Sequence, residues 1–159
     1  MPSPESVHQS AERPPGTAMI ETSVEAWNRG DLDGYFRHFR ADVVYHGLGS
    51  RIEGVAALRA HYSAFRIAMP DHTIRIVRAT GDASGRYVAG EFVESGTHTE
   101  DLITPEGTFP ATGRRVEAPI AVFCELDDHG LVAVMREYSD RSSLEQQLAG
   151  QDETTSNER

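Results

Sequence analysis

Apolar side chains recur every three or four residues in the N-terminal part of the chain, the spacing that places them on one face of a helix. Three such stripes occur: Ile20, Val24 and Trp27; Leu32, Tyr35, Phe36 and Phe39; and Val55, Leu58, Tyr62, Phe65 and Met69. Gly30 can end the first helix, Asp31 can cap the second, and Pro70 stops the third because proline cannot continue the hydrogen-bond ladder. The sequence therefore predicts three helices before Pro70.

Alternation of apolar and polar residues predicts strands instead of helices in most of the remaining chain. The expected strands are 42–46, 72–80, 86–98, 116–126 and 131–140. Short turns at 81–85 and 127–130 join consecutive strands, so these strands should pair antiparallel. The longer loop 99–113 has the length of a binding element or lid. Helices followed by an antiparallel sheet indicate the α+β class, with the helices on one face of the sheet.

The length and the two ends of the chain indicate one folded domain. Residues 1–17 are rich in Pro, Ser and Glu and should form a disordered lead, while 151–159 should form a disordered polar tail. The domain between them, 18–150, is large enough to bury a core around a ligand cavity. The residues that carry the protein's function are therefore expected within 18–150.

Composition restricts the partners and the compartment that the sequence predicts. The net charge of -10 argues against nucleic acid and anionic membranes as partners, and leaves small neutral ligands open. All 15 basic residues are arginines, which excludes a lysine Schiff base. The single Cys124 cannot form an intrachain disulfide, and no signal peptide or run of about 20 apolar residues occurs. We therefore expect a cytoplasmic protein.

Sequence motifs for metals and nucleotide cofactors are absent. The seven histidines show neither His-x-His nor His-Glu-x-x-His spacing, and no Gly-x-Gly-x-x-Gly follows a strand. We expect no metal and no cofactor.

The last predicted strand carries the leading candidates for chemistry. One face holds Val132, Val134, Arg136, Tyr138 and Asp140, and the other holds Leu131, Ala133, Met135, Glu137 and Ser139. If the first set faced a pocket, Arg136, Tyr138 and Asp140 would form a polar wall that orients a ligand. Asp140 has two interpretations that the sequence leaves open: a general acid/base, or a cap for the helix that follows.

Other polar candidates lie at strand ends or within strands. His98 can exchange protons with a substrate or fix a loop by a hydrogen bond. Tyr45 and His46 end the first strand, where they can reach a pocket rim. Glu91 and Glu94 are three residues apart on one strand, so only one of them can face inward.

Large side chains of the helical stripes form a further group. Trp27, Tyr62, Phe65 and Met69 belong to it. Such residues are more often core than ligand contacts, but around an internal pocket the core wall and the pocket wall are the same surface.

Several segments together resemble one known family. They are Gly96-Thr97-His98, residues 110–116, the first helix with 27–32, the turn 69–71, Asp140 and the helix around 144–148. From about Ala18 to Gly150 the chain resembles the SnoaL-like polyketide cyclase family of the nuclear-transport-factor-2-like superfamily. The resemblance implies a curved sheet wrapped by three helices, a cone or α+β barrel with an internal pocket.

The resemblance also implies a reaction and its residues. It implies cofactor-free intramolecular aldol ring closure of a small hydrophobic, polyketide-like substrate in secondary metabolism, such as antibiotic biosynthesis. Asp140 matches the family's acid/base position, with His98 assisting. The expected substrate contacts are Tyr45, His46, Tyr138, Trp27, Phe65, Met69, Glu91 and Arg136.

The fold leaves alternative functions open, and the sheet indicates a dimer. The same fold hosts isomerases, epoxide hydrolases, hydroxylases and non-catalytic ligand-binding modules. The epoxide hydrolases carry Arg-x-Asp on a central strand, which residues 89–94 lack. A sheet with apolar residues on both faces predicts a homodimer, with Leu131, Ala133 and Met135 on the shared outer face.

Overall fold

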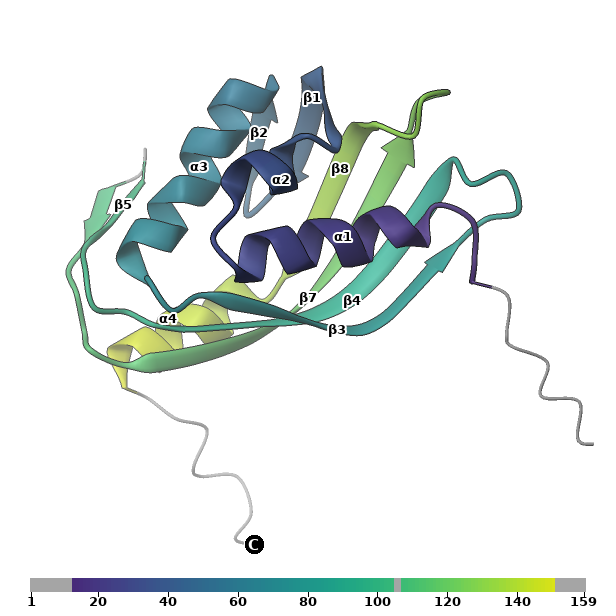
Figure 1. The fold of residues 1–159 in the computed structure, drawn as a ribbon. Coiled ribbons are helices and arrows are strands. Elements are labelled where there is room, and N and C mark those ends of the chain that lie inside the picture. The colour runs from purple at the N-terminus through teal and green to yellow at the C-terminus, as the bar shows by residue number, and fades with distance from the viewer. Residues whose placement is uncertain (1–12, 105–106, 151–159) are drawn as a thin grey trace, which may run out of the picture.

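Six strands form one curved sheet, and three helices pack across one of its faces (Figure 1). The computed structural model describes residues 13–104 and 107–150. The helices are α1 (Thr17–Asn28), α2 (Leu32–Phe36), α3 (Val55–Ala68) and α4 (Arg141–Ala149). The strands are β1 (Phe39–Gly47), β2 (Ser50–Glu53), β3 (Thr73–Gly81), β4 (Tyr87–Thr97), β5 (Leu102–Thr104), β6 (Gly107–Phe109), β7 (Arg115–Leu126) and β8 (Val132–Ser139). The predicted α+β class is confirmed.

The strands follow the order β2-β1-β8-β7-β4-β3, while β5 and β6 pair separately as a hairpin. Neighbours run antiparallel except β1 and β8, which run parallel. The turns predicted at 81–85 and 127–130 join β3 to β4 and β7 to β8, and both pairs are antiparallel as expected. Strand β1 pairs with β8, the last strand in the sequence. The helices before and after β1 in the sequence, α2 and α3, are therefore held over the sheet.

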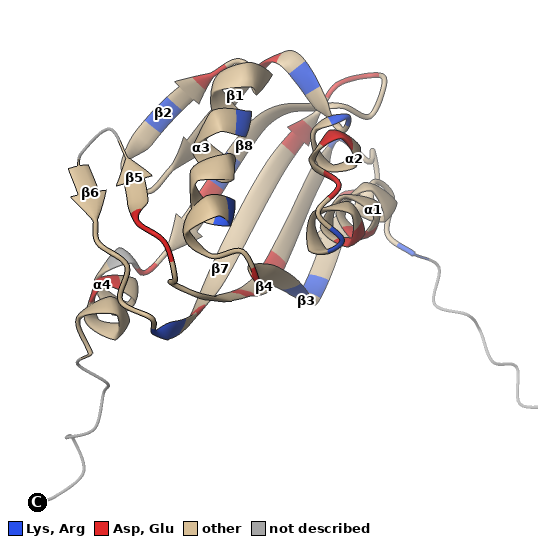
Figure 2. Cartoon of the chain, turned by 60° about the vertical axis from the view of Figure 1, so that its left-hand side comes forward, with Lys and Arg blue, Asp and Glu red and all other residues tan. Residues whose placement is uncertain are grey.

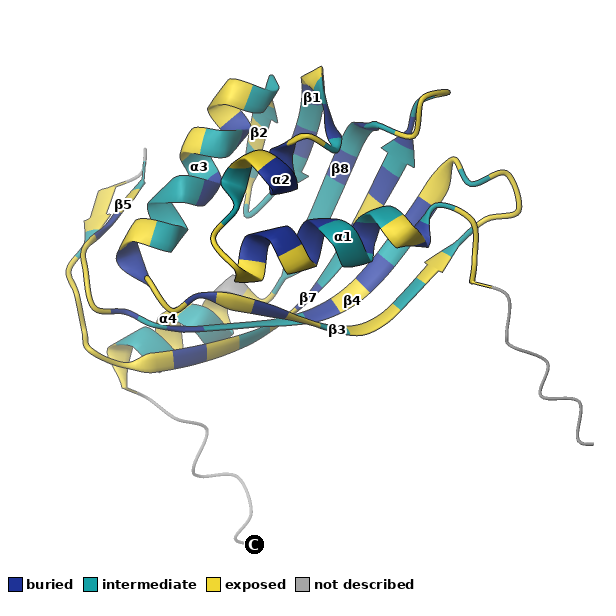
Figure 3. Cartoon of the chain, in the orientation of Figure 1, coloured by how far each residue is buried: buried dark blue, intermediate teal, exposed yellow. Residues whose placement is uncertain are grey.

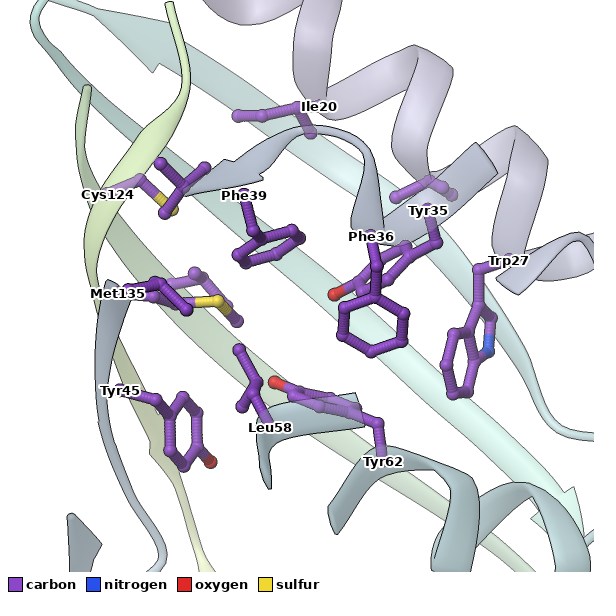
Figure 4. Close-up of a cluster of buried hydrophobic side chains, with 14 of the residues drawn as sticks. Ile20, Trp27, Tyr35, Phe36, Phe39, Tyr45, Leu58, Tyr62, Cys124 and Met135 are labelled. Carbon is purple, nitrogen blue, oxygen red and sulfur yellow. The ribbon is translucent and has the colours of Figure 1, made fainter. Parts of the chain in front are cut away.

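Aromatic rings from α1, α2, β1 and α3 form the centre of the core (Figure 4). Trp27 packs edge-on against Tyr35 and Tyr62, with ring centroids 5.2 and 5.9 Å apart. Such pairs contribute about 0.5–1.5 kcal/mol each beyond the area they bury. The helix faces turned toward the sheet are accordingly the buried ones (Figure 3). Phe39, expected on a helix, instead begins β1 and still joins this core.

A bulge near the start of β8 decides which of its side chains face inward. Leu126 of β7 pairs with Val132, but Glu125 pairs with Val134, so Ala133 is an extra residue. The extra residue shifts the alternation by one position. Met135, expected on the outer face, therefore lies in the core with 4% of its surface exposed.

The predicted lead and tail fall mostly outside the described residues. Residues 1–12 and 151–159 lie outside them, while 13–16 precede α1 as an ordered segment. There the Thr17 hydroxyl and N–H donate to the Pro14 carbonyl at 2.7 and 3.3 Å. The folded part thus begins a few residues before the predicted boundary.

Charged residues are spread over the sheet and the helices (Figure 2). Arg78 pairs with Glu91 at 2.9 Å, and Arg136 pairs with Glu125 at 2.6 Å. Pairs exposed to this extent contribute little to stability. Within the described residues, no helix is both long and apolar enough to cross a membrane.

Candidate functional site

A cavity of about 50 Å³ lies between the sheet and the helices, and we call it the central cavity. Its wall is mainly apolar and includes Trp27 of α1, Phe65 of α3, and Met69. A second space of about 50 Å³, the deep cavity, lies among the core residues of α1, β4 and β7. The two cavities share Tyr62, Glu94, Ile120 and Glu137 in their walls. Two carboxylates therefore stand where the cavities meet.

Glu94 reaches the cavity from β4 beside a fixed histidine. The Trp27 Nε1–H donates to His72 Nδ1 at 2.9 Å, and His72 Nε2 lies 3.6 Å from Glu94 Oε2. An indole nitrogen can only donate, so Nδ1 must accept. Neutral His72 therefore carries its proton on Nε2, directed toward the Glu94 carboxylate.

Glu137 reaches the same cavity from β8. The Tyr62 hydroxyl donates to Glu137 Oε2 at 2.7 Å. Burial, and then the negative charge of Glu94, raise the pKa of Glu137 to about 7, against the opposing hydrogen bond from Tyr62. Glu137 thus stays partly protonated close to neutral pH.

Local strand geometry places this pair. On β4 the buried positions Phe92 and Gly96 flank Glu94, so strand alternation turns Glu94 inward. On β8 the bulge at Ala133 turns Glu137 inward together with Met135. The question left open between Glu91 and Glu94 is thereby answered in favour of Glu94.

Asp140 lies at the edge of the central cavity as the cap of α4. Its Oδ1 accepts from the Ser142 hydroxyl at 2.7 Å and from the Ser143 N–H at 3.1 Å. These two hydrogen bonds lower the pKa of Asp140. Of the predicted contacts, Trp27 and Phe65 line the same cavity, as does Met69.

Two predicted site residues are buried away from the central cavity wall. His98 is 1% exposed, and its Nδ1 lies 3.2 Å from the Thr112 hydroxyl. Burial lowers the pKa of the His98 imidazole. Tyr45 is fully buried in the core and packs against the rings of His61 and Tyr62.

The remaining predicted contacts lie on the outer face of the sheet. His46 pairs in register with Arg136, whose guanidinium binds Glu125. Tyr138 is 58% exposed, and Glu91 pairs with Arg78. The β8 bulge and the alternation of β4 turn these side chains away from the cavity, so the polar wall expected from Arg136 and Tyr138 does not form there.

Glu137 and His72 were absent from the sequence-based candidates. Glu137 belongs to the alternating set of β8 that was expected to face outward. An acidic residue between the apolar Met135 and the small Ser139 is a signal that could have identified it. Among residues 13–104 and 107–150, no group of three or more His, Cys, Asp or Glu is arranged to hold a metal ion.

Known proteins share this fold and architecture. The family model for the SnoaL-like domain matches residues 20–135. A candidate polyketide cyclase of Xanthomonas campestris is 26% identical, with a TM-score of 0.73 over 84% of this chain and 96% of that one.

Two more distant structures show the same fold. A candidate hydroxylase of Streptomyces galilaeus is 21% identical, with a TM-score of 0.72 over 85% of this chain and 96% of its own. An LEH-like epoxide hydrolase of M. tuberculosis is 20% identical, with a TM-score of 0.63 over 85% of this chain and 90% of its own. Among curated proteins there is no match. With the family model spanning most of its folded part, the chain belongs to the SnoaL-like domain family.

Proposed function

We propose that the protein is an enzyme that closes a ring within a small carbonyl compound by general acid–base catalysis at Glu94 and Glu137, without a cofactor. The observation that carries the proposal is the pair of half-buried carboxylates in the wall of one mainly apolar cavity. Burial raises the pKa of Glu137 to about 7. The likeness to the candidate polyketide cyclase of Xanthomonas campestris supports the same reaction class.

The reaction divides between the two carboxylates. When Glu137 is protonated, Glu94 acts as the base and removes a proton from the carbon next to a substrate carbonyl. The electron pair of that C–H bond forms the new C–C bond to a second carbonyl carbon. Glu137 gives its proton to the oxygen of that second carbonyl, which becomes a hydroxyl. Substrate and product are isomers, and transfer of a proton from Glu94 to Glu137 restores the starting state.

Neighbouring groups position the pair. The Nε2–H of His72 faces the Glu94 oxygen that accepts the substrate proton, and the Trp27 hydrogen bond holds that ring in place. The Tyr62 hydroxyl holds Glu137. Enclosure of both carbonyls in one cavity supplies proximity, which lowers a barrier by roughly 7–11 kcal/mol at best.

A second candidate uses the same two groups for a different reaction. One carboxylate activates a water molecule and the other protonates an epoxide oxygen, which opens the ring to a diol. A proton donor and a base facing the same cavity favour this reaction too, and the M. tuberculosis epoxide hydrolase has the same fold. Asp140 with His98, as expected from the sequence, is the competing catalytic assignment.

Deuterium exchange tests the first step without knowledge of the natural substrate. In D₂O the protein should accelerate deuterium incorporation next to the carbonyl of 2-butanone, followed by proton NMR. Glu94→Gln should lower this rate roughly 10²–10⁴-fold. Asp140→Asn is the matched control, because it removes a carboxylate at the cavity edge and keeps the cap.

The outcomes separate the candidates. If Asp140→Asn abolishes deuterium exchange while Glu94→Gln leaves the exchange rate unchanged, the base is Asp140. Diol formation from styrene oxide without ketone exchange would favour epoxide hydrolysis. Neither activity, with ketone binding retained, would identify a binding module.

A further inference from the structure

A larger apolar space, which we call the outer cavity, lies beside the central cavity. Its volume is about 340 Å³, against about 50 Å³ for the central cavity. It lies between β2, α3, the β5–β6 hairpin and α4. Arg51 and Glu145 belong to its lining, but most of its wall is apolar and is formed by Ile52, Phe65, Leu102, Phe109, Leu144 and Leu148. No step of the proposed reaction uses this space.

The outer and central cavities adjoin each other. Leu48, His61, Phe65 and Leu144 line both. A site needs about 10–15 Å³ for each water-sized group, so the central cavity has room for only a few such groups. A substrate larger than a short ketone must therefore extend beyond the central cavity, and the outer cavity adjoins it at these four shared residues.

The hairpin has one face toward the outer cavity and one face toward solvent. Leu102 is 6% exposed and Ile103 is 67% exposed, as expected for neighbours on a strand. Phe109 pairs in register with Leu102 and lines the outer cavity with it. The hairpin thus supplies an apolar wall on one side and a solvent-facing surface on the other.

We propose that the outer cavity binds the apolar chain or ring of an amphiphilic ketone whose carbonyl end lies in the central cavity. Only the placement of the carbonyl end rests on the proposed function. The deep cavity, at about 50 Å³, is too small for the apolar part of such a substrate. The substrate class is therefore a ketone with a polar end and an extended apolar remainder.

A chain-length series of methyl ketones tests this. Trp27 is the only tryptophan and lines the central cavity, so its fluorescence reports occupancy. From 2-butanone to 2-decanone, the dissociation constant should fall about fourfold for each methylene that enters the outer cavity, and then level off. Phe109→Gln and Leu148→Gln should each flatten this dependence. Ile103→Gln, on the solvent face of the same hairpin, should preserve it.

A further variant separates this proposal from the catalytic one. Glu137→Gln should keep the chain-length dependence even where deuterium exchange is lost. A wild-type affinity independent of chain length would overturn the outer-cavity proposal. An unchanged dependence in folded Phe109→Gln and Leu148→Gln, checked by circular dichroism, would also overturn it.

Discussion

Replacing Glu137 with glutamine should make the protein more stable and less active at the same time. The folded protein raises the Glu137 pKa from its ordinary 4.5 to about 7. Between these two pH values the unfolded chain has released the proton that the folded protein still binds, so stability falls as pH rises. Each pH unit of difference is worth about 1.4 kcal/mol, which gives a penalty on the order of 3 kcal/mol above pH 7. Glutamine has a similar shape and carries no charge, so it avoids this penalty.

The assay is urea unfolding of the wild type and Glu137→Gln from pH 4.5 to 8.5, followed by circular dichroism. The two proteins should have similar free energies of unfolding near pH 4.5. The variant should gain progressively up to about pH 7 and keep the advantage above it. Glu91→Gln removes an outer-face carboxylate and is the matched control for the lost charge. If the curves for wild type and Glu137→Gln run parallel over the whole range, the inferred burial and charge coupling of Glu137 is wrong.

Three further changes test the surroundings of the pair. Trp27→Phe removes the hydrogen-bond donor to His72, so turnover should fall up to about tenfold, which is the net contribution of one hydrogen bond. Nitrogen NMR of the wild type should show a proton on His72 Nε2. A proton on Nδ1 instead would contradict the derived tautomer. Asp140→Asn should leave the melting temperature and turnover nearly unchanged, whereas Asp140→Ala should lower the melting temperature because the α4 cap is lost. The predicted homodimer should use the outer sheet face, where Phe123 and Tyr138 are exposed with ring centroids 5.9 Å apart. Sedimentation should therefore give a dimer for the wild type and a monomer for Phe123→Arg. A wild-type species of 17.5 kDa would contradict the prediction.

Local sequence patterns predicted the elements well because helix and strand periodicity depend on near neighbours. The three early helices and the turns after β3 and β7 follow directly from such patterns. Phe39 was misassigned because its spacing continues a helical stripe, although α2 ends at Phe36. The parallel pairing of β1 with β8 joins distant parts of the chain, and no local pattern encodes it.

The candidate site was harder to predict because its two carboxylates depend on strand facing. Alternation showed that Glu91 and Glu94 face opposite ways, but only packing against the helices decides which one is inside. On β8 a single extra residue, Ala133, reverses the facing of Glu137 and Tyr138. A bulge arises from pairing with the neighbouring strand, so the sequence of β8 alone indicated the wrong face.

Carbon NMR of the side-chain carboxylates tests most directly whether Glu137 holds a proton near neutral pH, as the proposed function requires. Protein labelled with ¹³C in its glutamates should show one carboxylate signal that titrates near pH 7, and this signal should be missing from Glu137→Gln. If every glutamate carboxylate of the wild type titrates below about pH 5, close to the ordinary range, Glu137 holds no proton at neutral pH and the acid–base pair does not exist.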